Sequence, residues 1–148
     1  MAGLRLVINR ARGQPSRLPY PADPPGERNK IKVLIVDDDF GICQTLSDIL
    51  KAEGYQVDIA NDGLQAIAKI KKNEFDVVLL DIIMPGMNGV ETYKEMKKVH
   101  LQAKVIMFTA YSAEELVSKA YREGVTEVMY KPLKVDSVIN SIMTLCSQ

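Results

Sequence analysis

The sequence predicts an α/β fold with one parallel sheet between two layers of helices, and three observations support this. Short apolar runs alternate with amphipathic helical patterns five times along the chain. Most of the runs are apolar throughout, which is typical of strands buried on both faces of a parallel sheet. A chain of 148 residues suffices for one domain with a full core. We therefore expect a three-layer, doubly wound (βα)5 sandwich with right-handed crossovers and the strand order 2-1-3-4-5.

The five strand and helix units are expected to follow one another from Ile31 onward. The predicted strands are residues 33–36, 55–60, 77–80, 105–108 and 125–130. The second of these alternates apolar and polar residues, which favours a place near the edge of the sheet. Apolar residues at helical spacing follow every strand, and the last helix is expected to begin near Val135 and nearly reach the C-terminus.

Polar residues mark where three of the helices should begin. Asp62 and Asn88 each precede a helical pattern, with Gln65 and Glu91 three residues further on. Such pairs are typical of the capping box, in which each side chain bonds to the backbone of the other residue. Ser112, followed three residues later by a glutamate, predicts the same arrangement for the fourth helix.

Residues 1–29 are expected to form an extension without regular structure, and residues 30–148 the folded domain. The extension contains prolines and glycines that interrupt helices and strands: Pro15, Pro19, Pro21, Pro24 and Pro25, with Gly13 and Gly26. Five arginines against two acids in residues 1–28 give this part a charge of +3, which leaves −3 on the remainder of a chain with zero net charge.

Composition excludes several classes of function. An acidic domain is a poor match for direct nucleic-acid binding, which depends on clustered cations. Cys43 and Cys146 are too few and too far apart for a disulfide framework or a zinc site, so we expect free thiols in a reducing cytoplasm. No apolar run approaches the ~20 residues that cross a bilayer, so we expect no membrane partner.

Polar side chains follow four of the five predicted strands. In a parallel sheet these positions share the carboxyl edge, and with the order 2-1-3-4-5 the acids face one another across the switch point between strands one and three. The residues are, in chain order, Asp37, Asp38, Asp39, Asp81, Thr109 and Lys131. Each could be a turn or surface residue if taken singly, but together they indicate a site.

This set of side chains predicts a phosphoryl-transfer site that uses a metal ion. Carboxylates packed closely raise one another's pKa, and a divalent cation relieves the repulsion. Oxygen ligands without nearby histidine or cysteine favour Mg²⁺ over Zn²⁺. Lys131 can offset charge on a phosphoryl group, and the Thr109 hydroxyl can donate to one of its oxygens. Asp81 is the expected acceptor, since carboxylates can form aspartyl-phosphates.

The segments VLIVDDD, DVVLLDIIMPGMNG and VIMFTA, followed by Lys131-Pro132, resemble the receiver domain of two-component response regulators, a CheY-like family with a flavodoxin-like fold. The resemblance extends from about Lys32 to the C-terminus. It implies that Asp81 takes a phosphoryl group from a sensor histidine kinase or a histidine phosphotransfer protein.

The same resemblance implies the roles of individual residues. Asp38 and Asp81 would bind Mg²⁺ with the backbone carbonyl of Ile83, and Asp37 would help through water. Thr109 would be the switch hydroxyl and Lys131 the lysine that pairs with the phosphate. The bond between Lys131 and Pro132 would be cis. The protein would then be a phosphorylation-driven switch, not an enzyme acting on a separate substrate.

Two features depart from the family pattern or tune it. Receivers often carry an aromatic residue three positions before the lysine, where this chain has Val128. Tyr130 is expected on the same strand face and could partly replace that aromatic residue.

Ile83 and Tyr111 are bulky residues near the phosphoryl site. Because both could exclude the hydrolytic water, we predict a long-lived phosphorylated state.

Other functions and several properties stay open. Asp37 and Asp39 form the D-x-D pattern of phosphatases of the haloacid dehalogenase type, although Gly41 is unusual there and no acidic pair ends a strand after Lys131. A flavodoxin-like FMN carrier is disfavoured, since three acids would repel the FMN phosphate. The sequence does not indicate the downstream partner, a monomer or a phosphorylation-dependent dimer, or whether the receiver stands alone or is part of a larger regulator.

Overall fold

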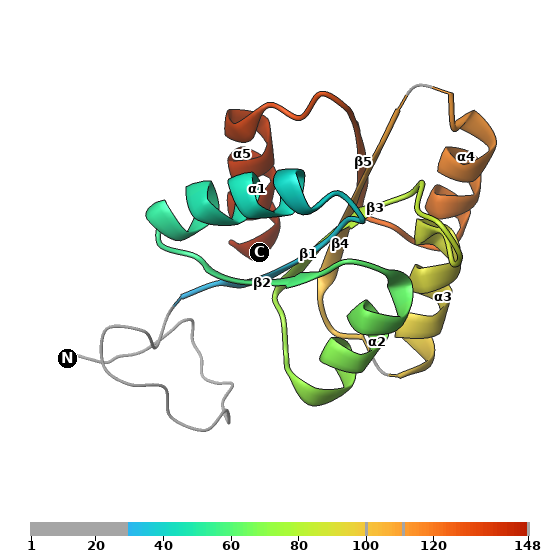
Figure 1. The fold of residues 1–148 in the computed structure, drawn as a ribbon, viewed down its shortest axis with the longest axis horizontal. Coiled ribbons are helices and arrows are strands. Elements are labelled where there is room, and N and C mark those ends of the chain that lie inside the picture. The colour runs from blue at the N-terminus through green and yellow to red at the C-terminus, as the bar shows by residue number, and fades with distance from the viewer. Residues whose placement is uncertain (1–29, 100, 111, 148) are drawn as a thin grey trace. The chain divides into compact units, whose positions relative to one another are not determined.

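The computed structural model describes residues 30–99, 101–110 and 112–147, so the predicted extension 1–29 and Tyr111 lie outside the described residues. Strands and helices alternate throughout this part of the chain (Figure 1). The strands are β1 (Lys32–Val36), β2 (Gln56–Ala60), β3 (Val77–Asp81), β4 (Lys104–Thr109) and β5 (Glu127–Tyr130). The helices are α1 (Phe40–Ala52), α2 (Gly63–Lys72), α3 (Gly89–Lys98), α4 (Glu114–Arg122) and α5 (Val135–Cys146).

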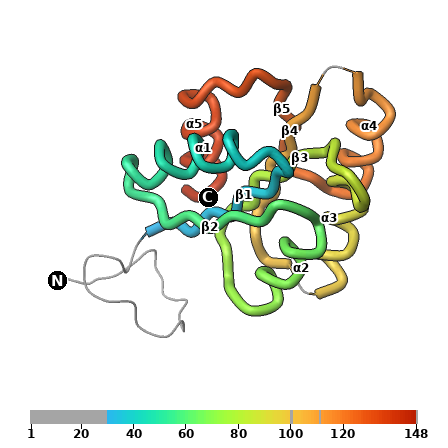
Figure 2. Tube along the Cα trace, in the orientation of Figure 1, coloured from blue at the N-terminus to red at the C-terminus, as the bar shows by residue number. Residues whose placement is uncertain are grey.

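The five strands form one sheet in the order β2-β1-β3-β4-β5, and every pairing is parallel. This confirms the predicted order and the position of β2 at an edge. Helices α1 and α5 lie on one face of the sheet, and α2, α3 and α4 lie on the other (Figures 1 and 2). From β1 the chain adds β2 on one side of the sheet and then β3, β4 and β5 on the other. The direction in which strands are added therefore reverses between β1 and β3, and open α/β sheets place their sites at such a point.

Alternate residues of each strand supply two separate cores. Leu34 and Val36 of β1 pack in the cluster that includes Met96 of α3, while Val33 and Ile35 pack in the cluster that includes Leu50 of α1. Helices cover both faces, so the central strands must be apolar on both sides. All five residues of β3 are buried, which explains its uninterrupted apolar run before Asp81.

The helix starts confirm one capping box fully and correct another. Asn88 Oδ1 accepts from the Glu91 N–H, and Glu91 Oε1 accepts from the Asn88 N–H, both at 2.9 Å. Asp62 accepts from the Gln65 N–H at 2.8 Å. The prediction of a capping box at Ser112 is wrong, because α4 begins one residue later than predicted, after the buried Ala113. Two glutamates in the first turn of α4 still suit the helix dipole.

Gly89 sets the distance between α3 and the end of β3. Its N–H donates to the Ile82 carbonyl at 2.8 Å. A Cβ at this position would lie 2.7 Å from Ile82 Cα and would also overlap the Asp81 carbonyl oxygen. Since these neighbours are backbone atoms, they cannot rotate away. A glycine is therefore required where α3 begins beside Asp81.

We expect Gly89→Ala to lower the free energy of unfolding by roughly 1–3 kcal/mol, because the added methyl group must displace backbone next to Asp81. Urea unfolding followed by circular dichroism measures the change. Gly41→Ala is the control, since its Cβ would approach only the side chain of Asp39, at 3.3 Å. Equal stability of the two variants would contradict the close approach.

No helix in the part of the chain that the structure describes is long and apolar enough to cross a membrane.

Candidate functional site

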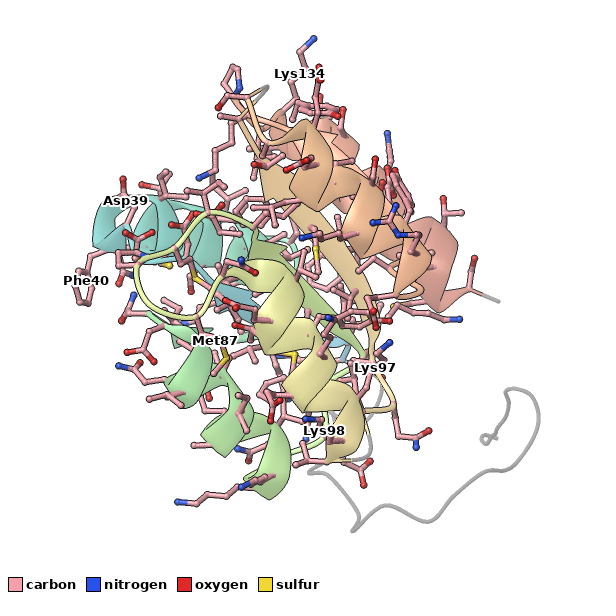
Figure 3. The ribbon with its side chains drawn as sticks, turned by 90° about the vertical axis from the view of Figure 1, so that its right-hand side faces the viewer. Asp39, Phe40, Met87, Lys97, Lys98 and Lys134 are labelled. Atoms are coloured by element: carbon pink, nitrogen blue, oxygen red, sulfur yellow. The ribbon has the colours of Figure 1, made fainter. Side chains whose placement is uncertain are left out.

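The carboxyl ends of four strands bring the predicted polar residues to one rim of the sheet. Asp37 follows β1, Asp81 ends β3, Thr109 ends β4 and Lys131 follows β5. Asp39 and Phe40, which are labelled in Figure 3, lie next to this rim, where α1 begins. The structure therefore brings together side chains that lie up to 94 residues apart in sequence, as the fold predicts.

Two buried carboxylates share one ammonium group. Lys131 Nζ lies 3.2 Å from Asp81 Oδ2 and 3.4 Å from Asp37 Oδ2. Asp37 is 1% exposed and Asp81 3% exposed. Asp38 is exposed, but one of its oxygens completes a group with Asp37 and Asp81 in which the candidate ligand atoms all lie within 4.8 Å of one another. Three carboxylates and one ammonium leave an excess of negative charge.

This excess appears in the pKa values of the site. Burial and the nearby Asp37 carboxylate raise the pKa of Asp81 to about 6, although Lys131 and the Ile83 N–H partly oppose the shift. Burial lowers the pKa of Lys131, but the carboxylates of Asp81 and Asp37 outweigh this, so its net shift is upward. At neutral pH the ammonium is charged and Asp81 is mostly ionised, at a cost to the stability of the metal-free fold.

We predict that Asp81→Asn stabilises the metal-free protein by about 1–3 kcal/mol at pH 7. Because the pKa of Asp81 rises from 3.8 to about 6 on folding, the folded protein retains a proton that the unfolded chain has lost between these values. The contribution of Asp81 to stability therefore decreases as pH rises from about 4 to about 6 and stays low above that range. Urea unfolding in EDTA at several pH values measures the difference. A difference that stays constant from pH 4 to pH 7 would contradict this explanation.

The Thr109 hydroxyl is buried without a partner. Thr109 is 0% exposed, and its Oγ1 has no hydrogen-bond partner among the described residues. A buried hydroxyl left without a partner is costly, and such groups call for an explanation. Its place on the acidic rim suits a donor that finds its acceptor when a ligand or modification arrives.

Three residues next to the rim make contacts that define their surroundings. The Ile83 N–H donates to Asp81 Oδ1 at 3.2 Å, and the Ile83 side chain is 51% exposed. The bond between Lys131 and Pro132 is cis, as the resemblance implied. Asp39 has a different role, because its Oδ1 accepts from the Ile42 N–H at 3.1 Å and caps α1. Asp39 is exposed and does not belong to the acidic cluster.

Two residues at this end of the sheet were missed by sequence reasoning. Asn61, directly after β2, and Cys43 of α1 both donate to the Asp37 carbonyl. Burial and nearby Asp37 raise the pKa of the Cys43 thiol to about 11, so it stays protonated. The signal in the sequence was an amide side chain at the end of the second strand, which otherwise ends in Ala60.

The region of Val128 contains a contact that the sequence did not predict. Val128 packs against the core cluster on the α2, α3 and α4 side of the sheet. Its N–H donates to the hydroxyl of Tyr121 in α4 at 3.2 Å. An aromatic side chain from α4 thus reaches β5 at the position where the family often has an aromatic residue of the strand itself. Tyr130 is 38% exposed.

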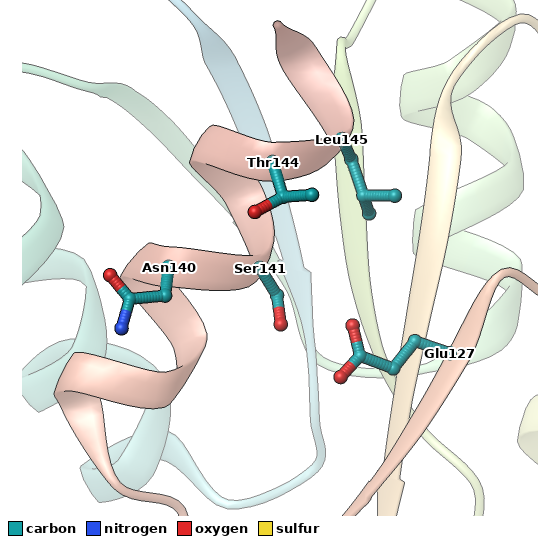
Figure 4. A pocket seen from close by; sticks show the side chains of 5 residues that line it. All are labelled: Glu127, Asn140, Ser141, Thr144 and Leu145. Atoms are coloured by element: carbon teal, nitrogen blue, oxygen red, sulfur yellow. The ribbon is translucent and has the colours of Figure 1, made fainter. Parts of the chain in front are cut away.

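A shallow pocket between β5 and α5 lies away from the acidic rim (Figure 4). It has a volume of about 170 Å³, and Glu127, Asn140, Ser141, Thr144 and Leu145 line it. Glu127 begins β5, whereas the strand meets the rim at its other end, through Lys131. The pocket therefore does not contribute to the chemistry of the carboxylates.

Comparison with known proteins agrees with this geometry. The sequence model of the response regulator receiver domain matches residues 33–143. The chain belongs to the response regulator receiver family. It is therefore a CheY-like receiver domain of a two-component system, and its fold and strand order are those of that family.

Individual relatives support the assignment of this receiver domain. It is 37% identical over 111 residues to sporulation initiation phosphotransferase F of Bacillus subtilis, covering 75% of this chain and 90% of that protein. It is 39% identical over 109 residues to the transcriptional regulatory protein ZraR of Klebsiella oxytoca, covering 74% of this chain. The match spans about a quarter (25%) of the length of ZraR. A CheY-like receiver domain from Methanospirillum hungatei superposes with a TM-score of 0.76 at 32% identity, covering 80% of this chain and 96% of that structure.

Proposed function

We propose that this receiver domain is a signalling switch that accepts a phosphoryl group on Asp81. One observation carries the proposal: a buried carboxylate lies 3.2 Å from the Lys131 ammonium, on the same rim as the unpartnered Thr109 hydroxyl. In this proposal Asp81 would be the nucleophile, the Lys131 ammonium would offset charge and the Thr109 hydroxyl would donate a hydrogen bond, all before any phosphoryl group arrives. Binding energy from Lys131 and Thr109 would appear only when the group is attached.

The acidic cluster fits a hard divalent cation. The carboxylates of Asp37, Asp38 and Asp81 can each offer an oxygen within 4.8 Å of the others, and their charge exceeds that of Lys131. Oxygen ligands of this kind suit Mg²⁺. We propose that these three residues hold Mg²⁺ with the Ile83 backbone carbonyl. When bound, the cation would neutralise charge on the oxygens of the phosphoryl group.

The transfer itself would use the residues of the rim. An Asp81 carboxylate oxygen attacks the phosphorus of a phosphohistidine, a P–O bond forms, and the P–N bond breaks with its electron pair left on the imidazole of the donor. The Lys131 Nζ then pairs with the new phosphoryl oxygens instead of the free Asp81 oxygen. The Thr109 hydroxyl donates to another of these oxygens, which satisfies its missing hydrogen bond.

The donor would be a sensor histidine kinase or a histidine phosphotransfer protein, as for receivers in general. The relative from Bacillus subtilis is named a phosphotransferase, which supports transfer between proteins. The output would be a change in the protein-binding surface of this domain, without direct contact to nucleic acid or membrane. Residues 30–148 would form the switch, as a monomer or as a phosphorylation-dependent dimer.

Phosphorylation with a small donor tests the proposal. We expect purified protein with acetyl phosphate and Mg²⁺ to gain the mass of one phosphoryl group, in a form that hydroxylamine removes, and to gain none when EDTA replaces Mg²⁺. A phosphoryl group that forms equally in EDTA would contradict the role of the cation.

The structure disfavours the phosphatase alternative. That mechanism needs Asp37 as nucleophile and Asp39 as a second acid facing the substrate. Asp37 Oδ1 accepts from the Asp39 N–H at 3.0 Å, and the Asp39 side chain is occupied as the cap of α1. The proposed switch uses Asp81 instead, which is buried beside Lys131.

We predict that the phosphorylated state is long-lived, because the Ile83 side chain, two residues after the proposed acceptor, would exclude the hydrolytic water. Ile83 is half exposed at the rim, and its N–H contacts Asp81. Ile83→Asn should therefore shorten the half-life of labelled protein in Mg²⁺ by about 3–10-fold, the effect of one well-placed polar group. Adding Tyr111→Glu extends the test, although Tyr111 lies outside the described residues. An unchanged half-life in the double variant would overturn the prediction.

A further inference from the structure

The backbone carbonyl of Asp37 accepts hydrogen bonds from two different elements. Cys43 Sγ in α1 donates at 3.3 Å, and Asn61 Nδ2, directly after β2, donates at 3.1 Å. The two donors also lie together, with 3.8 Å between Asn61 Nδ2 and Cys43 Sγ. The Asp37 N–H donates to the Ala60 carbonyl at 3.2 Å. Asp37 is thus held through both backbone groups.

This carbonyl controls the direction of the next residue. The Asp37 C=O and the Asp38 N–H belong to one planar peptide group, so fixing one fixes the other. The Asp38 side chain is exposed, whereas Asp37 and Asp81 are buried. Core packing therefore holds the other two carboxylates, while the position of the Asp38 carboxylate depends on its backbone.

Both donors are themselves anchored. Cys43 is 1% exposed and belongs to the core cluster under α1. Asn61 is half-buried, and its own N–H donates to Gln65 Oε1 of α2 at 3.0 Å. The Asp37 carbonyl is consequently tied to α1 directly and to α2 through Asn61. Such support behind metal ligands usually affects the affinity for the metal as well as stability.

We propose that Asn61 and Cys43 are positioning residues that hold the peptide between Asp37 and Asp38, so that both carboxylates face the same cation site as Asp81. This inference rests on the proposed function, because it takes the acidic cluster as a Mg²⁺ site. Neither residue needs to touch the cation or the phosphoryl group. Each acts through the Asp37 carbonyl, which rotates more freely once a donor is lost.

Calorimetric titration of the whole chain with Mg²⁺, without any phosphoryl donor, tests this inference. We expect Asn61→Ala to weaken Mg²⁺ binding by about 10-fold, the usual effect of losing a residue behind the ligands. Cys43→Ala should also weaken it, and Cys43→Ser, which keeps a donor, should restore most of the affinity. Asn73→Ala is the matched control, since Asn73 Nδ2 donates to the Lys69 carbonyl at 3.2 Å, remote from the acids.

The outcomes separate this inference from the proposed function. If the wild type binds Mg²⁺ and Asn61→Ala binds it as tightly as Asn73→Ala, the bonds to the Asp37 carbonyl are only structural and the inference is overturned. If the wild type binds no Mg²⁺, the cation site itself is wrong and both ideas fail. Circular dichroism verifies folding. Should Asn61→Ala not fold, Asn61→Ser, whose side chain is too short to reach the carbonyl, must show the same loss of affinity.

Discussion

Replacement of Asp81 by asparagine is expected to abolish phosphorylation by acetyl phosphate, with a loss of at least roughly 10³-fold in the initial rate. An amide oxygen lacks the charge and basicity of the carboxylate, and no covalent acyl phosphate can form on it. The variant should remain folded and, without metal, become more stable, since it removes a buried carboxyl group whose pKa is raised to about 6. Loss of phosphorylation together with a gain in stability would show that the variant lacks the acceptor and that its fold is undamaged.

Asp58→Asn provides the matched control for this change. Asp58 lies on β2 and pairs with Lys69 at 2.6 Å, with its side chain 43% exposed. The same chemical replacement there should leave the rate of phosphorylation unchanged, because an exposed pair contributes little and lies away from the rim. Residual phosphorylation of Asp81→Asn at a rate near that of Asp58→Asn would contradict the assignment of Asp81.

Replacement of Lys131 by methionine should slow phosphorylation by about 10²–10³-fold, the usual effect of removing one group that stabilises charge in the transition state. The same change should strengthen Mg²⁺ binding at pH 8, where Asp81 is ionised. The reason is that the ammonium occupies the Oδ2 atoms of both Asp37 and Asp81, at 3.4 and 3.2 Å, and repels a second cation. Phosphorylation rates by mass spectrometry and Mg²⁺ titration by calorimetry measure the two effects.

These opposite effects distinguish Lys131 from a residue that only supports the fold. Lys69→Met, which breaks the exposed pair with Asp58, should change neither quantity. An unchanged rate of phosphorylation in Lys131→Met would show that the ammonium does not act on the phosphoryl group, and weaker Mg²⁺ binding would show that it does not compete with the cation.

Much of this site could be predicted from sequence because parallel strands share one carboxyl edge. Continuous apolar runs located the strands, and the residue after each run then had to lie on the rim. This reasoning brought Asp37, Asp81, Thr109 and Lys131 together without knowledge of any distance. It also predicted β2 as an edge strand, since its alternating residues suit one exposed side.

What the sequence did not predict depends on contacts between elements. The bond from the Val128 N–H to Tyr121 joins β5 to α4, and no spacing within either segment indicates it. Asn61 and Cys43 meet at the Asp37 carbonyl because β2 and α1 converge there in space. The prediction of a capping box at Ser112 failed for a local reason, since α4 begins one residue later, after Ala113, and no side chain caps it.

The most direct test of the central claim is to locate the phosphoryl group. Protein phosphorylated in Mg²⁺ is reduced with borohydride, which converts an aspartyl-phosphate to homoserine, and is then digested and sequenced by mass spectrometry. We predict that the converted residue is Asp81 and that Asp37, Asp38 and Asp39 stay unchanged. Conversion at Asp37 would indicate the phosphatase-like mechanism, and the absence of any converted aspartate would contradict phosphorylation of the acidic site.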